Sequence, residues 1–179
     1  HCERNMNDPS FESPLIYEGH MNAKKKYNEM NKKKIDTIYS SPFLRTIQTG
    51  DFYSKMKEIP IIIDYSVAEY IVENDKMNMY SINNFEITDI WKKNFNLELN
   101  KMIYNKYSID ESITDVILRV FRFLNYLKSE YKSTNKNILI ITHMSIVNII
   151  LGLNNNFNNI SNIDKYIERY YPMGMISEV

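Results

Sequence analysis

The chain has 179 residues, of which 44% are hydrophobic and 13% aromatic, so it is long enough to bury one sizeable core. Lysine plus arginine and aspartate plus glutamate number 22 each, and this balance argues against a nucleic-acid or anionic-membrane partner. No apolar run approaches the about 20 residues that span a bilayer, and the only cysteine, Cys2, excludes an internal disulfide and suits a reducing compartment. We therefore expect a single cytoplasmic domain over residues 1–179.

Helices and short buried strands are expected to alternate along the chain. The predicted helices cover residues 15–33, 42–57, 110–131 and 146–151. The predicted strands cover residues 35–39, 59–63 and 138–141, of which the last two are isoleucine-rich runs bounded by polar residues. This alternation predicts an α/β fold, a three-layer α/β/α sandwich whose mainly parallel sheet is covered on both faces.

Two segments stand out from this rhythm. The helix over 110–131 has the clearest signals, because Ser108 and Glu111 have the spacing of a capping box and apolar residues line one face. That face contains Ile113, Val116, Ile117, Val120, Leu124 and Leu127. Residues 71–107 are polar, rich in Asn and Met, and contain the only tryptophan, Trp91, so we expect them to form an insertion over the edge of the sheet.

The clearest chemical signal begins at the first residue. His1-Cys2 resembles the start of the H-C-x5-R loop of the Cys-dependent tyrosine phosphatases, in which the arginine six residues after the cysteine grips phosphate. Asp8 occupies that position here, and its carboxylate would repel a phosphate dianion. We therefore expect Cys2 to be a small packing residue rather than a nucleophile.

Several segments, in chain order, match the motifs of one family. Residues 1–4 correspond to the end of an R-H-G-x-R motif, with cysteine in the glycine position, and residues 14–23 resemble a P-L-T-x-x-G-x-x-Q-A helix start. Residues 38–49 match an S-S-P-x-x-R-x-x-Q-T segment, Glu69 follows an isoleucine-rich strand, and His143 directly follows another. Together these segments resemble the histidine phosphatase (phosphoglycerate mutase-like) superfamily, over nearly the whole chain except about residues 71–107.

The subtype that the motifs resemble most is the suppressor-of-T-cell-signalling type of phosphatase, which carries R-H-G-E-R. Phosphoglycerate mutases usually have serine where this chain has Arg4, and an E-R-H-Y-G-type run where this chain has Glu69 followed by Tyr70. Arg119 matches a helix arginine common in the family, for which we expect a structural role. Residues 172–175 resemble the family's closing edge-strand segment.

The resemblance implies a phosphoryl-transfer site whose residues suit an anionic substrate. His1 would attack phosphorus and become a phosphohistidine, and Arg4 and Arg45 would hold phosphate oxygens with their planar guanidinium groups. His143, at the carboxyl end of its strand, would be catalytic and would donate to the same oxygens. Glu69 would protonate the leaving oxygen and then deprotonate the attacking water. No cofactor or metal is expected, since the three histidines lack an H-x-x-x-H spacing.

Two expectations concern residues outside this set. His20 is expected to be structural and to help the first helix pack. The family's arginine before the nucleophile, and the strand that carries it, are expected upstream of His1, because a doubly wound sheet without its central strand would expose two apolar faces.

Three functions remain open at this stage. The first is a metal-independent phosphomonoester hydrolase that acts through phosphohistidine on a phosphoprotein, a sugar phosphate or another small metabolite. The second is a phosphoglycerate mutase that uses the same site, and the third is a catalytically weak relative that serves as a binding subunit. The five retained site residues favour an active enzyme, whose partners are its phosphorylated substrate and, as a further option, a second copy in a homodimer.

Overall fold

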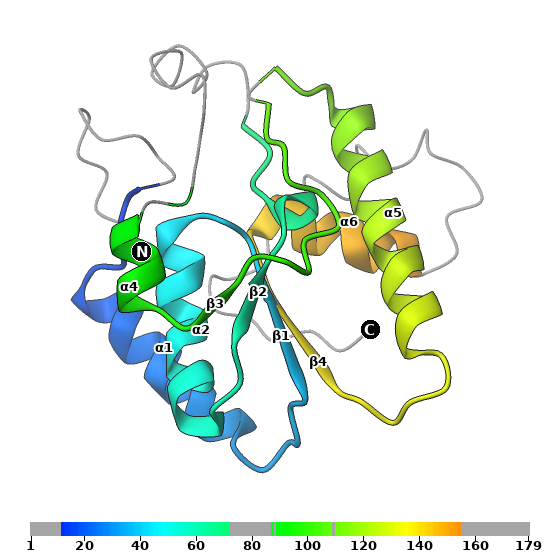
Figure 1. Ribbon diagram of the computed structural model, residues 1–179. Helices are drawn as coiled ribbons and strands as arrows, with labels where there is room; N and C mark the ends of the chain where they lie inside the picture. The colour runs from blue at the N-terminus through cyan, green and yellow to red at the C-terminus, as the bar shows by residue number, and fades with distance from the viewer. Residues whose placement is uncertain (1–11, 72–86, 88, 109, 155–179) are drawn as a thin grey trace.

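The computed structural model describes residues 12–71, 87, 89–108 and 110–154, and a sheet lies at its centre (Figure 1). The sheet contains β1 (Thr37–Ser40), β2 (Ile61–Ile63), β3 (Leu97–Glu98) and β4 (Ile138–Ile141), in the order β3-β2-β1-β4. Each strand of this sheet runs parallel to its neighbours. The predicted parallel sheet is therefore confirmed.

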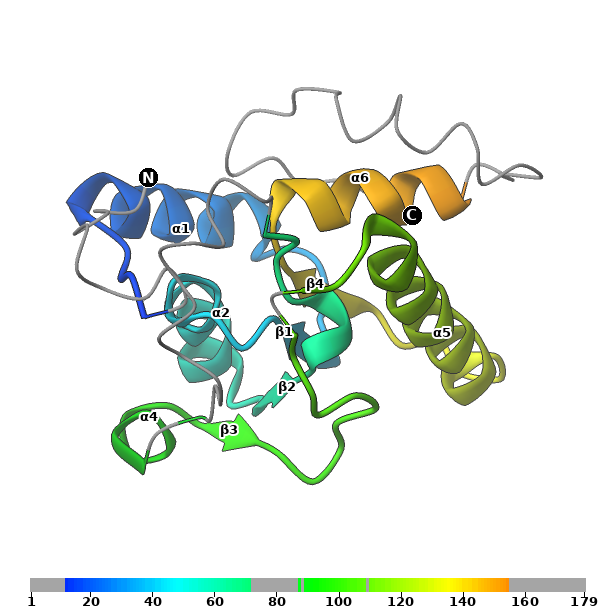
Figure 2. The same cartoon turned by 90° about the horizontal axis from the view of Figure 1, so that it is seen from above.

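Helices cover both faces of the sheet, as the view from above shows (Figure 2). On one side lie α1 (Tyr17–Met30), α2 (Leu44–Lys57) and the short α4 (Asp89–Asn94). On the other side lie α5 (Ile113–Tyr131) and α6 (Met144–Asn154). The three-layer α/β/α prediction is confirmed, and the bounds of the seven predicted helices and strands differ from those observed by no more than three residues.

The strands β2 and β4 are apolar on both faces, which is why they read as unbroken isoleucine-rich runs. Successive residues of a strand point to opposite faces of the sheet. Ile38 and Ile61 accordingly join the core on the side of α1 and α2. Tyr39 and Ile62, the next residues along, join the core on the side of α5 and α6. The strands β1, β2 and β4 therefore each contribute to two cores, and the central strands β1 and β2 are buried from both sides.

The helix α5 begins at Ile113, with Ser112 as its N-cap, and not after Ser108 as the predicted capping box implied. Ser112 Oγ accepts a hydrogen bond from the Asp115 N–H at 3.2 Å, and Asp115 Oδ2 accepts one from the Ser112 N–H at 3.0 Å. Ser112 and Asp115 thus form the capping box, so the prediction of Ser108 and Glu111 is wrong. Both pairs have the same three-residue spacing, but the Glu111 carboxylate instead binds the buried Arg119.

The segment predicted as an insertion contributes a strand to the sheet. Leu97 pairs with Ile61 and Glu98 with Ile62, which makes β3 the edge strand beside β2. Trp91 of α4 is buried in the core on the side of α1 and α2. The interpretation as an insertion over the edge is therefore too coarse for residues 89–98, while residues 72–86 lie outside the described part. Of the described helices, none is both long and apolar enough to cross a bilayer.

Candidate phosphoryl-transfer site

Four polar side chains converge where neighbouring parallel strands end. Ser41 directly follows β1, and Arg45 lies in the first turn of α2, a few residues later. Glu69 follows β2 through the short 3₁₀ helix η1 (Tyr65–Val67), and His143 follows β4. Because β2, β1 and β4 are adjacent and parallel, their carboxyl ends meet at one edge of the sheet, where α/β folds place their sites.

Three of these residues, Arg45, Glu69 and His143, are in mutual contact. His143 Nδ1 lies 2.9 Å from Glu69 Oε2. Arg45 Nη2 lies 3.3 Å from His143 Nδ1 and 3.7 Å from Glu69 Oε2. The side chains of Arg45 and Glu69 are 17% and 23% exposed, whereas that of His143 is 4% exposed. The cluster therefore presents a guanidinium and a carboxylate to solvent above a buried imidazole.

Further side chains fix the orientation of this cluster. Ser145, in the first turn of α6, donates a short hydrogen bond to Glu69 Oε1. Ser41 Oγ lies 2.8 Å from His143 Nε2. The Phe43 ring lies 4.6 Å from the Arg45 guanidinium and packs edge-on against the His143 ring, with 4.8 Å between ring centroids. These three residues are not among the predicted site residues, although Ser41 and Phe43 stand beside the proline of the S-S-P motif.

The cluster holds Glu69 in its ionised form. Burial favours the neutral acid and would raise the pKa of Glu69, but His143, the Ser145 hydroxyl and the Arg45 guanidinium all stabilise the carboxylate. Their combined effect outweighs burial, and the pKa of Glu69 lies well below its ordinary value of 4.5. Near pH 7 the site therefore contains a carboxylate.

His143 is shifted toward its neutral form. Burial has the largest effect and lowers the pKa of the imidazole below its ordinary value of 6.5. The Glu69 carboxylate opposes this shift, while the positive charges of Arg45 and Arg119 add to it. Near pH 7 the imidazole is therefore uncharged, and it binds Glu69 as a hydrogen-bond donor.

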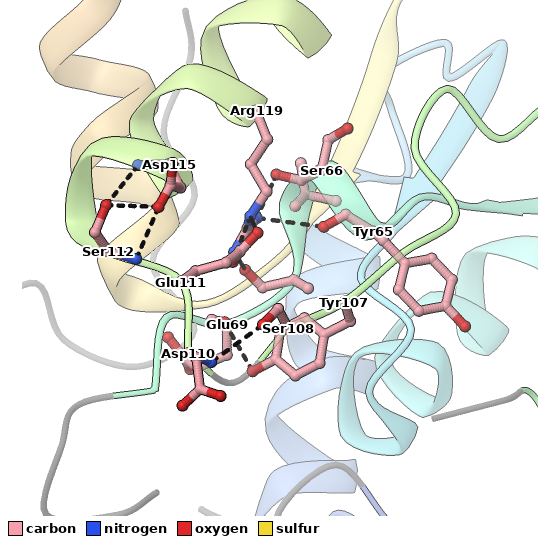
Figure 3. Close-up of polar contacts among 12 residues, drawn as sticks. Tyr65, Ser66, Glu69, Tyr107, Ser108, Asp110, Glu111, Ser112, Asp115 and Arg119 are labelled. Carbon is pink, nitrogen blue, oxygen red and sulfur yellow. Dashed lines mark hydrogen bonds and ion pairs between the residues drawn. The ribbon is translucent and has the colours of Figure 1, made fainter. Parts of the chain in front are cut away.

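Arg119 holds the segment that leads to Glu69 (Figure 3). Its guanidinium reaches from α5 to three backbone carbonyls and binds both carboxylate oxygens of Glu111 through Nε, at 3.0 and 3.2 Å. The carbonyls, with their distances, are those of Tyr65 at 3.3 Å, Ser66 at 2.6 Å and Ala68 at 2.9 Å. These contacts agree with the structural role expected for Arg119.

Two hydroxyl groups hold the same segment from other elements. Tyr107 donates a hydrogen bond of 3.2 Å to the Glu69 carbonyl, which Figure 3 also shows. Thr142, the residue before His143, donates one of 2.6 Å to the Val67 carbonyl. The backbone at Glu69 is therefore tied both to the loop after β3 and to the end of β4.

The structure thus brings together Arg45, Glu69 and His143, three of the five predicted site residues. His1 and Arg4 lie outside the described residues, as do Cys2, Asp8 and residues 172–175, so their roles stay predictions. His20 is half-buried on α1 and packs edge-on against Phe52 of α2, with 6.2 Å between ring centroids. Within the described ranges, no group of three or more His, Cys, Asp or Glu side chains could hold a metal ion.

Several solved structures share this fold. The Bacillus stearothermophilus protein YhfR superposes with a TM-score of 0.61 at 16% identity, over 96% of this chain and 81% of that one. The ecdysone phosphate phosphatase of Bombix mori, solved with tungstate, gives 0.60 at 15% identity, over 94% and 65% of the two chains. The alpha-ribazole phosphatase of Shigella flexneri gives 0.55 at 19% identity, over 86% and 75%.

Sequence comparison gives an independent result. No curated protein matches the chain significantly. A family model, that of the histidine phosphatase superfamily (branch 1), matches residues 3–162 and so includes Arg45, Glu69 and His143. The chain belongs to the histidine phosphatase superfamily, branch 1.

Proposed function

We propose that the protein is a phosphomonoester hydrolase that needs no metal and works through a phosphohistidine on His1. The observation that carries this proposal is the contact among Arg45, Glu69 and His143 at the carboxyl ends of β1, β2 and β4. A fixed cation and a neutral donor stand beside a carboxylate that can exchange a proton. Such a set suits a reaction in which negative charge spreads over phosphoryl oxygens while a leaving oxygen needs a proton.

The reaction would proceed in two displacements. In the first, the His1 imidazole attacks phosphorus, the bond to the leaving oxygen breaks, and Glu69 supplies the proton that this oxygen takes up. In the second, water attacks the phosphohistidine, Glu69 takes the proton of that water, and phosphate leaves with His1 restored. Arg45, His143 and Arg4 would donate to the non-bridging oxygens throughout.

Glu69 can act as an acid only after the substrate has changed its surroundings. In the ligand-free site, Glu69 Oε2 uses the same His143 nitrogen and Arg45 nitrogen that a phosphoryl group would bind. A bound dianion would take these donors from Glu69 and bring negative charge close to it, and both effects raise the pKa of the carboxyl group. The substrate would therefore convert Glu69 from a held carboxylate into a proton donor.

The substrate we expect is a phosphorylated small molecule or a phosphoprotein. Two structural neighbours are named as phosphatases of small molecules, alpha-ribazole phosphate and ecdysone phosphate, and these names favour a small phosphomonoester. We expect the protein to act in the cytoplasm, because its single cysteine suits a reducing compartment.

Trapping the covalent intermediate tests the proposal. A protein that contains His1 is reacted with a labelled phosphomonoester, and the adduct is mapped and tested for stability. We expect an acid-labile, base-stable adduct on His1 that is lost in His1→Ala and kept in the control His20→Ala. An adduct on Cys2, or full activity in His1→Ala, would overturn the mechanism. Interconversion of 2- and 3-phosphoglycerate faster than phosphate release would show a mutase instead.

A further inference from the structure

Ser41 is fully buried and rigidly held at the end of β1. Its backbone N–H donates to the Ile141 carbonyl of β4 at 3.0 Å. Its carbonyl accepts from the hydroxyls of Ser40 at 3.0 Å and Thr46 at 2.9 Å. The side chain is 0% exposed and points its hydroxyl at His143 Nε2, 2.8 Å away. A hydroxyl held in this way can determine the orientation of the imidazole ring and which of its nitrogens carries the proton.

The contacts of His143 determine which ring nitrogen carries the proton. Nδ1 lies 2.9 Å from Glu69 Oε2, and an ionised carboxylate can only accept hydrogen bonds, so Nδ1 is assigned the proton. The longer approach of Arg45 Nη2 to the same nitrogen, 3.3 Å, is then a contact between two donors and not a hydrogen bond. In a neutral imidazole Nε2 then has a lone pair and needs a donor. Ser41 Oγ already accepts from the Phe43 N–H at 3.4 Å, which leaves its own proton free to be donated to Nε2.

We propose that Ser41 is a positioning residue that donates its hydroxyl proton to His143 Nε2 and so holds His143 as the neutral tautomer with its proton on Nδ1. This tautomer directs an N–H toward Glu69, on the side where the proposed function places the phosphoryl group. This proposal depends on the proposed phosphatase function only for the statement that the group bound there is a phosphoryl group. The hydrogen bond and the tautomer are properties of the ligand-free protein.

The charges around His143 are compatible with this assignment. Glu69 faces Nδ1 from the loop after η1, Arg45 faces it from α2, and Arg119 acts on it from α5. Two cations and the burial of the ring oppose a charge on it, and one carboxylate favours it. The neutral imidazole keeps its Nδ1–H at pH values above the pKa of the ring. It can therefore still donate a hydrogen bond to an oxyanion when the ring carries no charge.

Nitrogen NMR of the ligand-free protein tests the tautomer directly. The chain has three histidines, so His143 can be assigned by comparison with His20→Ala and His143→Asn. Near pH 7 we expect a pyrrole-type Nδ1 and a pyridine-type Nε2 whose resonance is shifted by an accepted hydrogen bond. A proton on Nε2, or an imidazolium at this pH, would overturn the proposal whether or not any variant folds.

Ser41→Ala tests the donor itself, with Ser40→Ala as the matched control. Ser40 is equally buried and adjacent, but its hydroxyl bonds the Ser41 carbonyl and not the ring. Ser41→Ala should move the Nε2 resonance toward that of a free pyridine-type nitrogen and lower kcat/KM by about 3- to 10-fold, as expected for one lost hydrogen bond. Ser41→Thr should restore both. Ser40→Ala removes one contact to the Ser41 carbonyl but leaves the hydroxyl beside the ring, so it should change both far less than Ser41→Ala.

The two proposals fail separately. An unchanged Nε2 resonance and an unchanged kcat/KM in folded Ser41→Ala would overturn the role of Ser41. A protein that shows the expected tautomer but hydrolyses no phosphomonoester would overturn the proposed function and leave the role of Ser41 intact.

Discussion

Arg119 Nη2 donates a hydrogen bond of 2.9 Å to the carbonyl of Ala68, the residue immediately before Glu69. Through this contact, a helix on one face of the sheet determines where the candidate acid lies at the end of β2. The guanidinium is buried and is neutralised by Glu111, whose carboxylate is 11% exposed. The position of Glu69 therefore depends on a buried ion pair that would not touch the substrate.

Removing this cation should destabilise the whole fold. Arg119→Met leaves the Glu111 carboxylate and three backbone carbonyls without their donor, and breaking a buried pair in this way costs about 3–5 kcal/mol. Urea unfolding measures the loss. Arg122→Met, an exposed arginine on the same helix, is the control and should change stability by less than about 0.5 kcal/mol. Equal losses in the two variants would contradict the role of Arg119.

A second substitution shows how much of the stability lost in Arg119→Met comes from the unpaired charge of Glu111 and how much from lost packing. Adding Glu111→Gln to Arg119→Met removes the carboxylate that the first change leaves unpaired. The double variant should therefore be more stable than Arg119→Met alone. A double variant with the summed loss of both single changes would show that the two side chains act independently.

Glu69 should matter in proportion to how poor the leaving group is. Protonation helps a departing alkoxide far more than a nitrophenolate, which is stable without a proton, and general acid catalysis contributes about 10²- to 10⁴-fold. Glu69→Gln should cost much of that factor on a sugar phosphate and clearly less on p-nitrophenyl phosphate. Both rates are measured for phosphoenzyme formation, because Glu69 also acts later as a base.

Arg45→Ala is the control for this comparison. Arginine stabilises phosphoryl charge for every substrate, so its loss should depend little on the leaving group. Equal losses on both substrates in Glu69→Gln would assign the acid to another residue.

Acid should destabilise the folded protein in two stages. The pKa of His143 is lower in the folded protein than in the unfolded chain, so on acidification the unfolded chain takes up this proton first. The contribution of His143 to the free energy of unfolding is therefore full above pH 6.5 and falls as the pH drops below that value. The folded pKa of Glu69 is also lowered, so its contribution is present above 4.5 and is lost as the pH falls toward the folded pKa.

Unfolding free energies measured from pH 8 to pH 3 check this order. His143→Gln should flatten the change that begins near 6.5, and Glu69→Gln should flatten the one that begins near 4.5. A His143→Gln curve parallel to the wild-type curve over the first interval would be inconsistent with a buried neutral imidazole.

The end of α2 offers a stabilising substitution. Glu58, its C-cap residue, has φ 56° and ψ 33°, a left-handed conformation that costs a non-glycine residue about 1 kcal/mol. Glu58→Gly should relieve this strain and raise Tm by about 2–4 °C for a chain of this size. Met56→Gly, at an exposed position inside the same helix, should instead lower Tm.

Substitution by glycine should raise Tm at Glu58 and lower it at Met56. A lowered Tm in both variants would mean that the backbone at Glu58 is not strained, because glycine would then bring only its entropic cost.

Part of the site could be predicted from the sequence because its residues follow recognisable segments. His143 stands two residues after an isoleucine-rich strand, and Arg45 stands in an S-S-P segment at the start of a helix. Glu69 follows another strand after a short interval. Parallel strands with apolar residues on both faces lie next to one another, so polar residues just beyond their carboxyl ends are brought to one edge.

Two errors show where local patterns were insufficient. The spacing of a capping box fits both Ser108 with Glu111 and Ser112 with Asp115, and only the burial of Arg119 decides that Glu111 is used elsewhere. The strand β3 has two residues and no apolar run, so its place in the sheet comes from hydrogen bonds to β2 and not from its own composition.

By itself, the sequence determined the layered α/β fold, the family, and three residues of the cluster at the ends of the strands. Those features depend on periodicity and on short motifs, which are local properties of the chain. The tertiary structure alone decided that Ser41 binds a ring nitrogen of His143, 102 residues away, and that Arg119 fixes the approach to Glu69. Such contacts depend on which buried donors and acceptors come within about 3 Å after the helices have packed, and no local pattern specifies that distance.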